Sequence, residues 1–448
     1  MATKKQLPNY KDKKVLILGL GLLGRGLKDA IFFAEKGAEV TVTDLKTENQ
    51  LQNSLIHLKK YPNINYTLGK HLEEDILNAD LIIRNAGIPL KSKFLQLAFK
   101  SKKKVEMDES LFAKYCPCPI IGITGTRGKS TTTTLIGKIL QDNWANEKRK
   151  VYIAGNLRGE ATLPLVDVVT KNDIVVLELS SWQLQGFGWE KISPQISVFT
   201  NIFPDHMNSY KTMKEYINDK KLIFQNQKKS DLSIINNENN YTKNIKKEIK
   251  SKVVSFNKSD IPKTWKIKAL GDHNRENISA AIAVAKELGL SKKQIQATIE
   301  DFPGIEHRLE FVKELNDIKF YNDTTSTTPV AGIVALNSVP EPIILLAGGA
   351  TKNLNLTNFA RKIAKKVKAV ILLEGSATDE LEKKIIKYGG ENIIAGRYDN
   401  FEKAIEHAYS LSLPEDTVLL SPGCASFGMF INEFDRGDQF KKIINQLK

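Results

Sequence analysis

This chain is constrained most strongly by a glycine-rich turn between an apolar strand and a polar helix start, which begins at Ile120 and reads IIGITGTRGKSTTTT. Gly125 and Gly128 allow the backbone to fold so that consecutive N–H groups point at phosphate oxygens. Lys129 adds a positive charge near the outer phosphates, and the Ser130 hydroxyl can ligate Mg²⁺. An isoleucine stands at the first glycine of the strict G-x-x-x-x-G-K-[ST] pattern, so the segment predicts a shortened phosphate loop. The alternative is a Gly/Ser/Thr turn that only caps a helix.

A second glycine motif lies near the N-terminus. Gly19, Gly21 and Gly24 follow the apolar run KVLIL in G-x-G-x-x-G spacing, and the next apolar run ends near Asp44. This pattern is typical of the mononucleotide half of a doubly wound fold. Alone it favours an NAD enzyme with Asp44 on a ribose hydroxyl, or a tight turn without a ligand. Because a phosphate loop follows downstream, we expect one nucleotide as part of a substrate and a second as the energy source.

The composition indicates a large enzyme. With 448 residues, of which 41% are hydrophobic, the chain can form about three domains. It has no leading signal peptide and no apolar run of about 20 residues, so we expect a cytoplasmic protein without a membrane partner. Cys116, Cys118 and Cys424 lack the spacing of a zinc site or a disulfide framework, which predicts reduced thiols.

The net charge of +15 raises the question of a nucleic-acid partner. Only 10 of the 66 basic residues are arginine, the residue favoured for contacts to bases and phosphates. The lysine runs resemble solvated helix faces, and no basic stripe with interleaved aromatic residues occurs. We therefore expect no nucleic-acid partner, but a general attraction for phosphorylated substrates.

Proline and glycine mark two joints, Tyr115–Pro119 and Phe302–Gly304, which predict domains at residues 1–116, 117–303 and 304–448. Short apolar runs alternate with helical patterns in every part. We expect an α/β protein with a Rossmann-like N-terminal domain, a central P-loop mononucleotide-binding α/β domain and a Rossmann-like α/β C-terminal domain, with ligands at the carboxyl ends of strands. Besides the strand before the phosphate loop, the predicted strands are 15–18, 39–43, 81–84, 151–153, 174–179, 196–201, 319–322, 342–348, 369–373 and 417–421.

Two of these strand ends carry polar residues suited to a metal. Glu178 stands where a buried strand stops and a helix begins at Ser180 or Ser181. A carboxylate beside a phosphate loop can hold Mg²⁺ directly or through water, although it can also cap the neighbouring helix. Asp205 and His206 follow the next predicted strand, and this position favours a ligand role for His206.

Further short motifs, taken with their order and spacing, resemble the Mur ligases, the ATP-dependent amide-bond-forming enzymes of bacterial cell-wall synthesis. The resemblance covers nearly the whole chain. It rests on GLGLLG with Asp44, NAGIP at 85–89, GTRGKST, GN at 155–156, ELSSWQL, DHM, GDHNREN at 271–277, EHR at 306–308, NDTTSTTP at 322–329 and SPGCASF at 421–427.

The resemblance implies a role for residues in every part. The catalytic residues would be Lys129, His206 and Lys220. ATP would contact Gly125, Thr126, Arg127, Gly128, Lys129, Ser130, Thr131, Asn274, Asn277, Arg308 and Asp323. Two Mg²⁺ ions would be held by Ser130, Glu178, His206 and Lys220. The substrates would contact Gly21, Leu22, Leu23, Asp44, Asn85, Gly87, Asn156, Lys352, Ser426 and Phe434, with Asp44 accepting from uracil and the last three receiving the amino acid.

The implied reaction is two-step acyl activation in a monomeric enzyme. The terminal carboxylate of UDP-MurNAc-L-Ala attacks the γ-phosphate of ATP, and the amine of glutamate then attacks the acyl phosphate. Because an ammonium group repels Mg²⁺, Lys220 would carry a carbamate; alternatively Lys220 and Lys221 are two solvated lysines, or the register is off by one. Convergence of distant ATP-binding segments would require the C-terminal domain to close about a hinge at 302–304.

Two departures and several alternatives remain. Thr325 stands where the family often has Lys, and residues 234–239 read IINNEN instead of an acidic strand end. These changes affect the expected amino-acid specificity, including D- against L-glutamate. The segment NKSD at 257–260 matches a guanine-reading element of GTPases, but no D-x-x-G lies between the phosphate loop and this segment. Folylpolyglutamate synthases, a related ligase class, lack the N-terminal UDP-binding domain.

Overall fold

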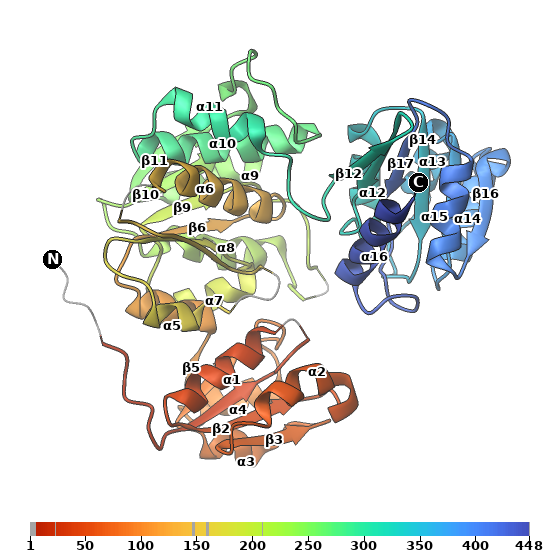
Figure 1. The fold of residues 1–448 in the computed structure, drawn as a ribbon. Helices are drawn as coiled ribbons and strands as arrows, with labels where there is room; N and C mark the ends of the chain where they lie inside the picture. The colour runs from red at the N-terminus through yellow and green to blue at the C-terminus, as the bar shows by residue number, and fades with distance from the viewer. Residues whose placement is uncertain (1–5, 23, 146–147, 158–160, 208, 448) are drawn as a thin grey trace. The chain divides into compact units, whose positions relative to one another are not determined.

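A computed structural model of the chain describes residues 6–22, 24–145, 148–157, 161–207 and 209–447. It contains three β-sheets, each flanked by helices (Figure 1). The α/β class expected for all three parts is confirmed. The described part of the chain contains no helix with both the length and the apolar character needed to cross a bilayer.

The first sheet is parallel, with strand order β3-β2-β1-β4-β5. Strand β1 lies in the middle, where Val15 pairs with Val40 and Leu81, and its apolar residues are buried because helices cover both faces. Three of the five strands were predicted. The other two, β3 and β5, contain only short apolar stretches. The elements are β1 (Lys14–Leu18), α1 (Arg25–Glu35), β2 (Glu39–Asp44), α2 (Glu48–Leu58), β3 (Ile64–Leu68), α3 (Glu73–Asn78), β4 (Leu81–Arg84), α4 (Lys93–Lys100), β5 (Lys104–Glu106) and α5 (Asp108–Tyr115).

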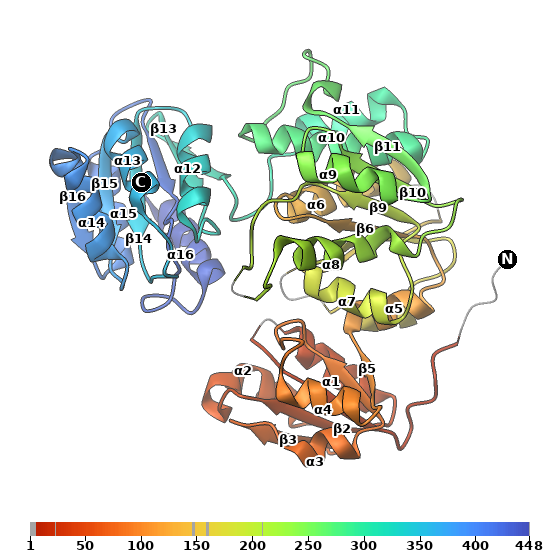
Figure 2. The same cartoon turned by 180° about the vertical axis from the view of Figure 1, so that it is seen from behind.

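The second sheet is also parallel, with order β11-β10-β9-β6-β8-β7. Helix α6 lies on one face, α7 and α8 lie on the other, and α7 packs on both α5 and α8 (Figures 1 and 2). The elements are β6 (Ile120–Thr124), α6 (Lys129–Trp144), β7 (Val151–Gly155), η1 (Leu163–Asp167), β8 (Ile174–Glu178), α7 (Ser181–Trp189), β9 (Ile196–Phe199), α8 (Met213–Gln225), β10 (Leu232–Asn236), α9 (Asn240–Ile245), η2 (Lys246–Glu248), β11 (Lys252–Phe256), η3 (Lys258–Asp260), α10 (Asp272–Glu287) and α11 (Lys292–Asp301).

The third sheet has order β12-β13-β17-β14-β15-β16 and is parallel except for its first strand. Strand β12, which was not predicted, forms an antiparallel hairpin with β13 through Asn316 and Asp317, both at positive φ as a two-residue hairpin turn requires. The elements are β12 (Glu310–Leu315), β13 (Ile318–Asn322), α12 (Pro329–Ser338), β14 (Ile343–Gly348), α13 (Thr357–Lys366), β15 (Ala369–Leu373), α14 (Thr378–Lys387), η4 (Glu391–Ile393), β16 (Ile394–Tyr398), α15 (Phe401–Ser410), β17 (Thr417–Leu420) and α16 (Glu433–Gln446).

The chain divides into two compact units. One comprises residues 1–263 and 276–298 and contains the first two sheets, and the other comprises 264–275 and 299–448. The division falls within α10, so the GDHNREN segment is shared between the units. Each unit has its own buried apolar clusters.

Candidate functional site

The phosphate loop joins β6 to α6 in the first unit. Gly125 and Gly128 have φ of 151° and 81°, and a Cβ at either position would overlap the side chain of Thr200 or Asn277 respectively. The prediction that this loop requires glycine is therefore confirmed. The prediction that its consecutive N–H groups all point at phosphate is wrong for two of them. The amides of residues 126 and 127 donate instead to the carbonyl (2.8 Å) and side-chain (2.9 Å) oxygens of Asn201. The first amides of α6, which have no intrahelical acceptor, remain the groups that can face phosphate.

Glu178 ends β8, next to the phosphate-loop strand, where it pairs with Ile123. Its side chain is 2% exposed, and Oε1 accepts a hydrogen bond of 2.9 Å from Asn156 Nδ2. Among the described residues, Oε2 is buried without a hydrogen-bond partner. A buried carboxylate oxygen without a donor is costly unless a cation compensates it, so this oxygen fits a Mg²⁺ ligand. The cap of α7 is Ser180, which accepts from Gln183 N, so Glu178 is not needed as a helix cap.

Lys220 on α8 is the buried basic residue of this region. It is 2% exposed and its Nζ donates to the carbonyl oxygen of Gly125 at 2.7 Å. Burial, aided by the charge of Lys129, lowers the pKa of Lys220 well below its ordinary value. Lys221 instead pairs with Glu248 at 2.7 Å. The two adjacent lysines therefore differ in surroundings, and Lys220 is the one at the phosphate loop.

His206 lies beside the same loop, in a left-handed backbone conformation with φ of 57°. Its ring centroid is 4.7 Å from that of Trp182 and 6.1 Å from that of Tyr216. Burial lowers the pKa of His206. Asp205 raises this pKa, and Lys129 and Lys220 lower it. The net lowering favours the neutral imidazole that metals require.

The N-terminal glycine loop is held by Asp44. One carboxylate oxygen accepts from Gly21 N and the other from Lys46 N, both at 2.9 Å. Asn85 lies against this loop and accepts from Gly87 N at 2.9 Å. Of the other residues predicted here, Leu22 is exposed, and Leu23 lies outside the described residues.

In the second unit, Asp323 is buried rather than presented at the surface. Its oxygens accept from the hydroxyls of Ser326 and Ser421 and from Leu309 N. Burial raises the pKa of Asp323 to about 6. This carboxylate ties the end of β13 to β17 and to the turn carrying Arg308, which is exposed. A ribose contact would have to share a carboxylate that already accepts three hydrogen bonds.

The remaining predicted residues are divided between the units. Asn274 belongs with Arg308 and Asp323, and its Nδ2 donates to Leu270 O at 2.7 Å; Asn277 belongs with the phosphate loop, where it accepts from Thr132 Oγ1 at 3.5 Å. The amino-acid candidates lie in the second unit: Lys352 donates to Thr327 Oγ1 at 2.8 Å, Ser426 is buried, and the Phe434 ring is 5.7 Å from that of His307.

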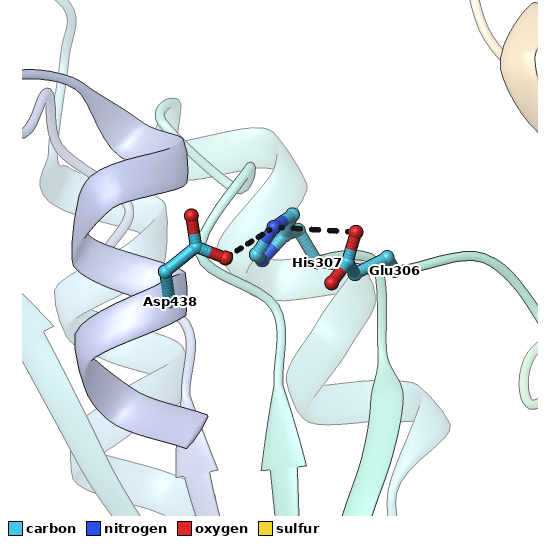
Figure 3. Close-up of side chains that lie close together, drawn as sticks. All are labelled: Glu306, His307 and Asp438. Atoms are coloured by element: carbon cyan, nitrogen blue, oxygen red, sulfur yellow. Dashed lines mark ion pairs between the residues drawn. The ribbon is translucent and has the colours of Figure 1, made fainter. Parts of the chain in front are cut away.

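Glu306, His307 and Asp438 form the one metal-like cluster found among the described residues (Figure 3). His307 Nδ1 lies 3.1 Å from Asn322 Nδ2, which also donates to Glu310 Oε2 and Gly437 O. His307 Nε2 lies 3.3 Å from Asp438 Oδ1 and has no hydrogen-bond partner among the described residues.

The Lys441 ammonium contacts Glu306 and lies 3.5 Å from Glu310 Oε1, so a cation already compensates these acidic groups. The cluster is therefore a structural link between α16 and the Arg308 turn.

The segment NKSD has a local structural role as well. Asp260 Oδ2 accepts from Asn257 N at 2.7 Å, closing a capping turn at the end of β11. A carboxylate engaged in its own turn is poorly placed to accept from guanine. This geometry argues against the GTPase alternative.

Sequence reasoning missed Asn201, although it fixes the phosphate loop through two acceptors and its neighbour Thr200 donates to Arg127 O at 2.7 Å. The available signal was its position as the last residue of the predicted strand 196–201. The three cysteines form no disulfide in the described structure, as expected.

The fold and the loop region are typical of nucleotide-triphosphate-binding enzymes, and one acidic and one basic residue are buried beside the candidate phosphate loop. Family models match residues 13–106 (Mur ligase MurD-like, N-terminal domain), 123–266 (Mur ligase middle domain) and 307–424 (Mur ligase, glutamate ligase domain). Together with the near-full-length relatives described next, these matches show that the chain belongs to the Mur ligase family.

The relatives carry the name UDP-N-acetylmuramoylalanine--D-glutamate ligase. The protein from Roseiflexus sp. is 38% identical, over 96% of this chain and 98% of its own length, and that from Borreliella afzelii is 36% identical over 99% and 100%. Among solved structures, UDP-N-acetylmuramate-alanine ligase from Thermotoga maritima matches with a TM-score of 0.62 and 17% identity, covering 97% of this chain and 100% of that one. At this identity the structural match shows the fold alone.

Proposed function

We propose that this chain is an ATP-dependent carbon–nitrogen ligase that adds D-glutamate to UDP-MurNAc-L-Ala in peptidoglycan precursor synthesis. The observation that carries the proposal is a sequence identity of 36% and 38% to two D-glutamate ligases over nearly the full length of each chain. It is combined with a phosphate loop beside which Glu178 and Lys220 are buried. The proposal includes a cytoplasmic monomer with domains at 1–116, 117–303 and 304–448.

In the proposed reaction, the alanine carboxylate attacks the γ-phosphorus of ATP, a C–O–P bond forms and ADP leaves. The glutamate amine then attacks the acyl carbon, forms the amide, loses a proton and expels phosphate. Lys129 and the N-terminus of α6 reduce the repulsion between the two anions of the first step. Neutral His206 and the orphaned oxygen of Glu178, with Ser130, would hold Mg²⁺, which supplies charge stabilisation at the transferred phosphoryl group.

The decisive experiment combines a nucleotide panel with both enantiomers of glutamate. Purified protein and UDP-MurNAc-L-Ala are mixed with ATP or GTP and with D- or L-glutamate, and phosphate release and product mass are measured. We expect both signals only with ATP and D-glutamate. Equal product from L-glutamate would support the alternative specificity, and GTP hydrolysis without the UDP substrate would support a GTPase.

Lys220 is proposed to be carbamylated. Burial lowers the pKa of Lys220 and so favours the neutral amine, the form that adds CO₂, and the resulting anionic oxygen is a ligand that Mg²⁺ prefers. We expect Lys220→Ala to be nearly inactive and partly rescued by short carboxylic acids. Lys221→Ala is the matched control and should keep its activity. Full activity of Lys220→Ala would refute the carbamate.

Lys352, Ser426 and Phe434 are proposed to receive glutamate through a cation, a hydroxyl and an apolar wall. Lys352→Ala should raise the KM for glutamate far more than that for ATP. Equal changes in both would assign Lys352 to the nucleotide.

ATP binding through Asn274, Arg308 and Asp323, together with the phosphate loop, is proposed to require closure about residues 302–304. Solution scattering should then give a more compact profile with nucleotide and substrate. Identical profiles with and without them would contradict closure.

A further inference from the structure

Arg84, the last residue of β4, is buried with 1% exposure and lies directly before the Asn85–Ile88 loop. Its Nε and Nη2 donate to Ile88 O at 2.8 and 2.6 Å, which closes that loop around the guanidinium. Its Nη1 points away from the loop and donates to Gln185 Oε1 at 2.6 Å. Arg84 thus connects the first sheet to α7 of the second.

Gln185 links Arg84 to helix α8. Its Nε2 donates to Asp219 Oδ2 on α8 at 2.6 Å, and the same oxygen accepts from the Tyr210 hydroxyl at 2.9 Å. One amide therefore joins a buried cation to a half-buried anion. A primary amide suits this role because it offers an acceptor to one charge and a donor to the other.

The two ends of this chain of contacts reach the proposed reaction site. Asp219 directly precedes Lys220, and Tyr210 N donates to His206 O at 3.0 Å. At the other end, the loop closed by Arg84 contains Asn85 and Gly87, which are expected to contact the UDP substrate.

Replacing one residue in this series of contacts should displace the residues at its other end. Arg84 is buried and Asp219 is half-buried, and each hydrogen-bonds to Gln185, so each charge depends on these contacts for compensation. Loss of one partner leaves the other uncompensated, and it must move or recruit water.

We propose that Arg84 is a positioning residue that couples the Asn85–Ile88 loop to Lys220 and His206 through Gln185 and Asp219. The inference rests on the proposed function, because it gives the loop and the two central residues their ligands. Arg84 itself touches no reacting atom in this proposal.

The test compares Arg84→Met with Arg361→Met, an exposed arginine on α13 of the other unit whose guanidinium lies over the Tyr388 ring. Arg84→Met should lower kcat and raise the KM for UDP-MurNAc-L-Ala, up to roughly 100-fold in kcat/KM for displaced reacting groups, with little change in the KM for ATP. Arg361→Met should change none of these. An unchanged KM for UDP-MurNAc-L-Ala in Arg84→Met would overturn the proposal.

A double-mutant cycle separates coupling from general damage. Either substitution interrupts the same series of contacts. The double variant Arg84→Met/Asp219→Asn should therefore lose a much smaller factor in kcat/KM than the product of the two single losses. Multiplying losses would overturn the coupling. If Arg84→Met does not fold, Gln185→Met, which keeps both charges but removes the bridge, should show the same KM pattern.

Amide hydrogen exchange provides a readout that needs no substrate. Arg84→Met should speed exchange within α8, far away in sequence, while exchange changes confined to β4 and its loop would refute the coupling. Wild-type protein that makes no product would refute the proposed function instead, so the two failures are distinguishable.

Discussion

The two glycine loops of the first unit have the same topology and opposite chemistry. Each follows the central strand of a parallel sheet and ends in a glycine at nearly the same φ, 82° at Gly24 and 81° at Gly128. The first loop is tied by the carboxylate of Asp44. The second is tied by neutral Asn201 and has Lys129 and Lys220 beside it.

The helices after the loops differ in the same way. Helix α1 buries Asp29, whereas the first turn of α6 buries threonines. A loop with a carboxylate acceptor disfavours a triphosphate, and a loop tied by a neutral amide with Lys129 beside it favours one. Under the proposed function, the same strand–loop–helix unit would serve two ligands because of the side chains placed around it.

The largest expected effect is at Glu178, the buried carboxylate on the strand next to the second loop. Glu178→Gln removes charge but keeps shape, so turnover should fall by roughly 100- to 1,000-fold, as for loss of one charge-stabilising group. Binding of UDP-MurNAc-L-Ala should stay within a few-fold by calorimetry. Turnover near that of the wild type at saturating Mg²⁺ would make Glu178 structural.

Gly24 and Gly128, the last glycines of the two loops, form a matched pair for substitution. Alanine at either position adds the strain of a left-handed backbone, about 1 kcal/mol. At Gly128 the added Cβ also meets the Asn277 side chain, whereas at Gly24 it meets no atom of the described residues within 4 Å. Gly128→Ala should therefore destabilise the protein by about 1–2 kcal/mol more than Gly24→Ala in urea unfolding and weaken ATP binding. Equal losses would show that Asn277 yields freely.

Asp44 tests the first loop. Asparagine can accept from only one of the amides of Gly21 and Lys46, so Asp44→Asn loses one charge-assisted bond of about 1.5 kcal/mol. If that loss falls on the substrate complex, the KM for UDP-MurNAc-L-Ala rises roughly tenfold, and the KM for ATP stays unchanged. A selective change in the KM for ATP would reverse the assignment of the two loops.

The smallest effect concerns pH and the carboxylates near α1. Burial, with Glu109, raises the pKa of Asp108 from 3.8 to about 7, so the folded state binds its proton more tightly than the unfolded state. This contribution to the free energy of unfolding is full below pH 4 and is lost as pH rises to about 7. Asp108→Asn should flatten that fall by on the order of 1 kcal/mol between pH 5 and 8 in urea unfolding. An unchanged slope would contradict the raised pKa.

Sequence reasoning predicted most of the strands that are buried on both faces, because such strands appear as continuous apolar runs. It missed β3, β5, β12 and β16, which mix exposed or partly buried positions with buried ones, and β10, which is buried but interrupts its apolar run with Ser233 and Asn236. Residues at strand ends, such as Glu178, were also predictable, since parallel strands bring their carboxyl ends to one edge.

The sequence by itself determined the α/β class, the phosphate loop and the Mur ligase motifs, since these depend on local spacing. Only the tertiary structure decided which of two adjacent lysines faces the loop, because neighbours on a helix differ by about 100° in direction. It also showed that the carboxylates of Asp44 and Asp323 accept hydrogen bonds from neighbouring loops, and that Arg84 is linked to α8 through Gln185. These properties arise from contacts between residues far apart in the chain, and no local pattern encodes them.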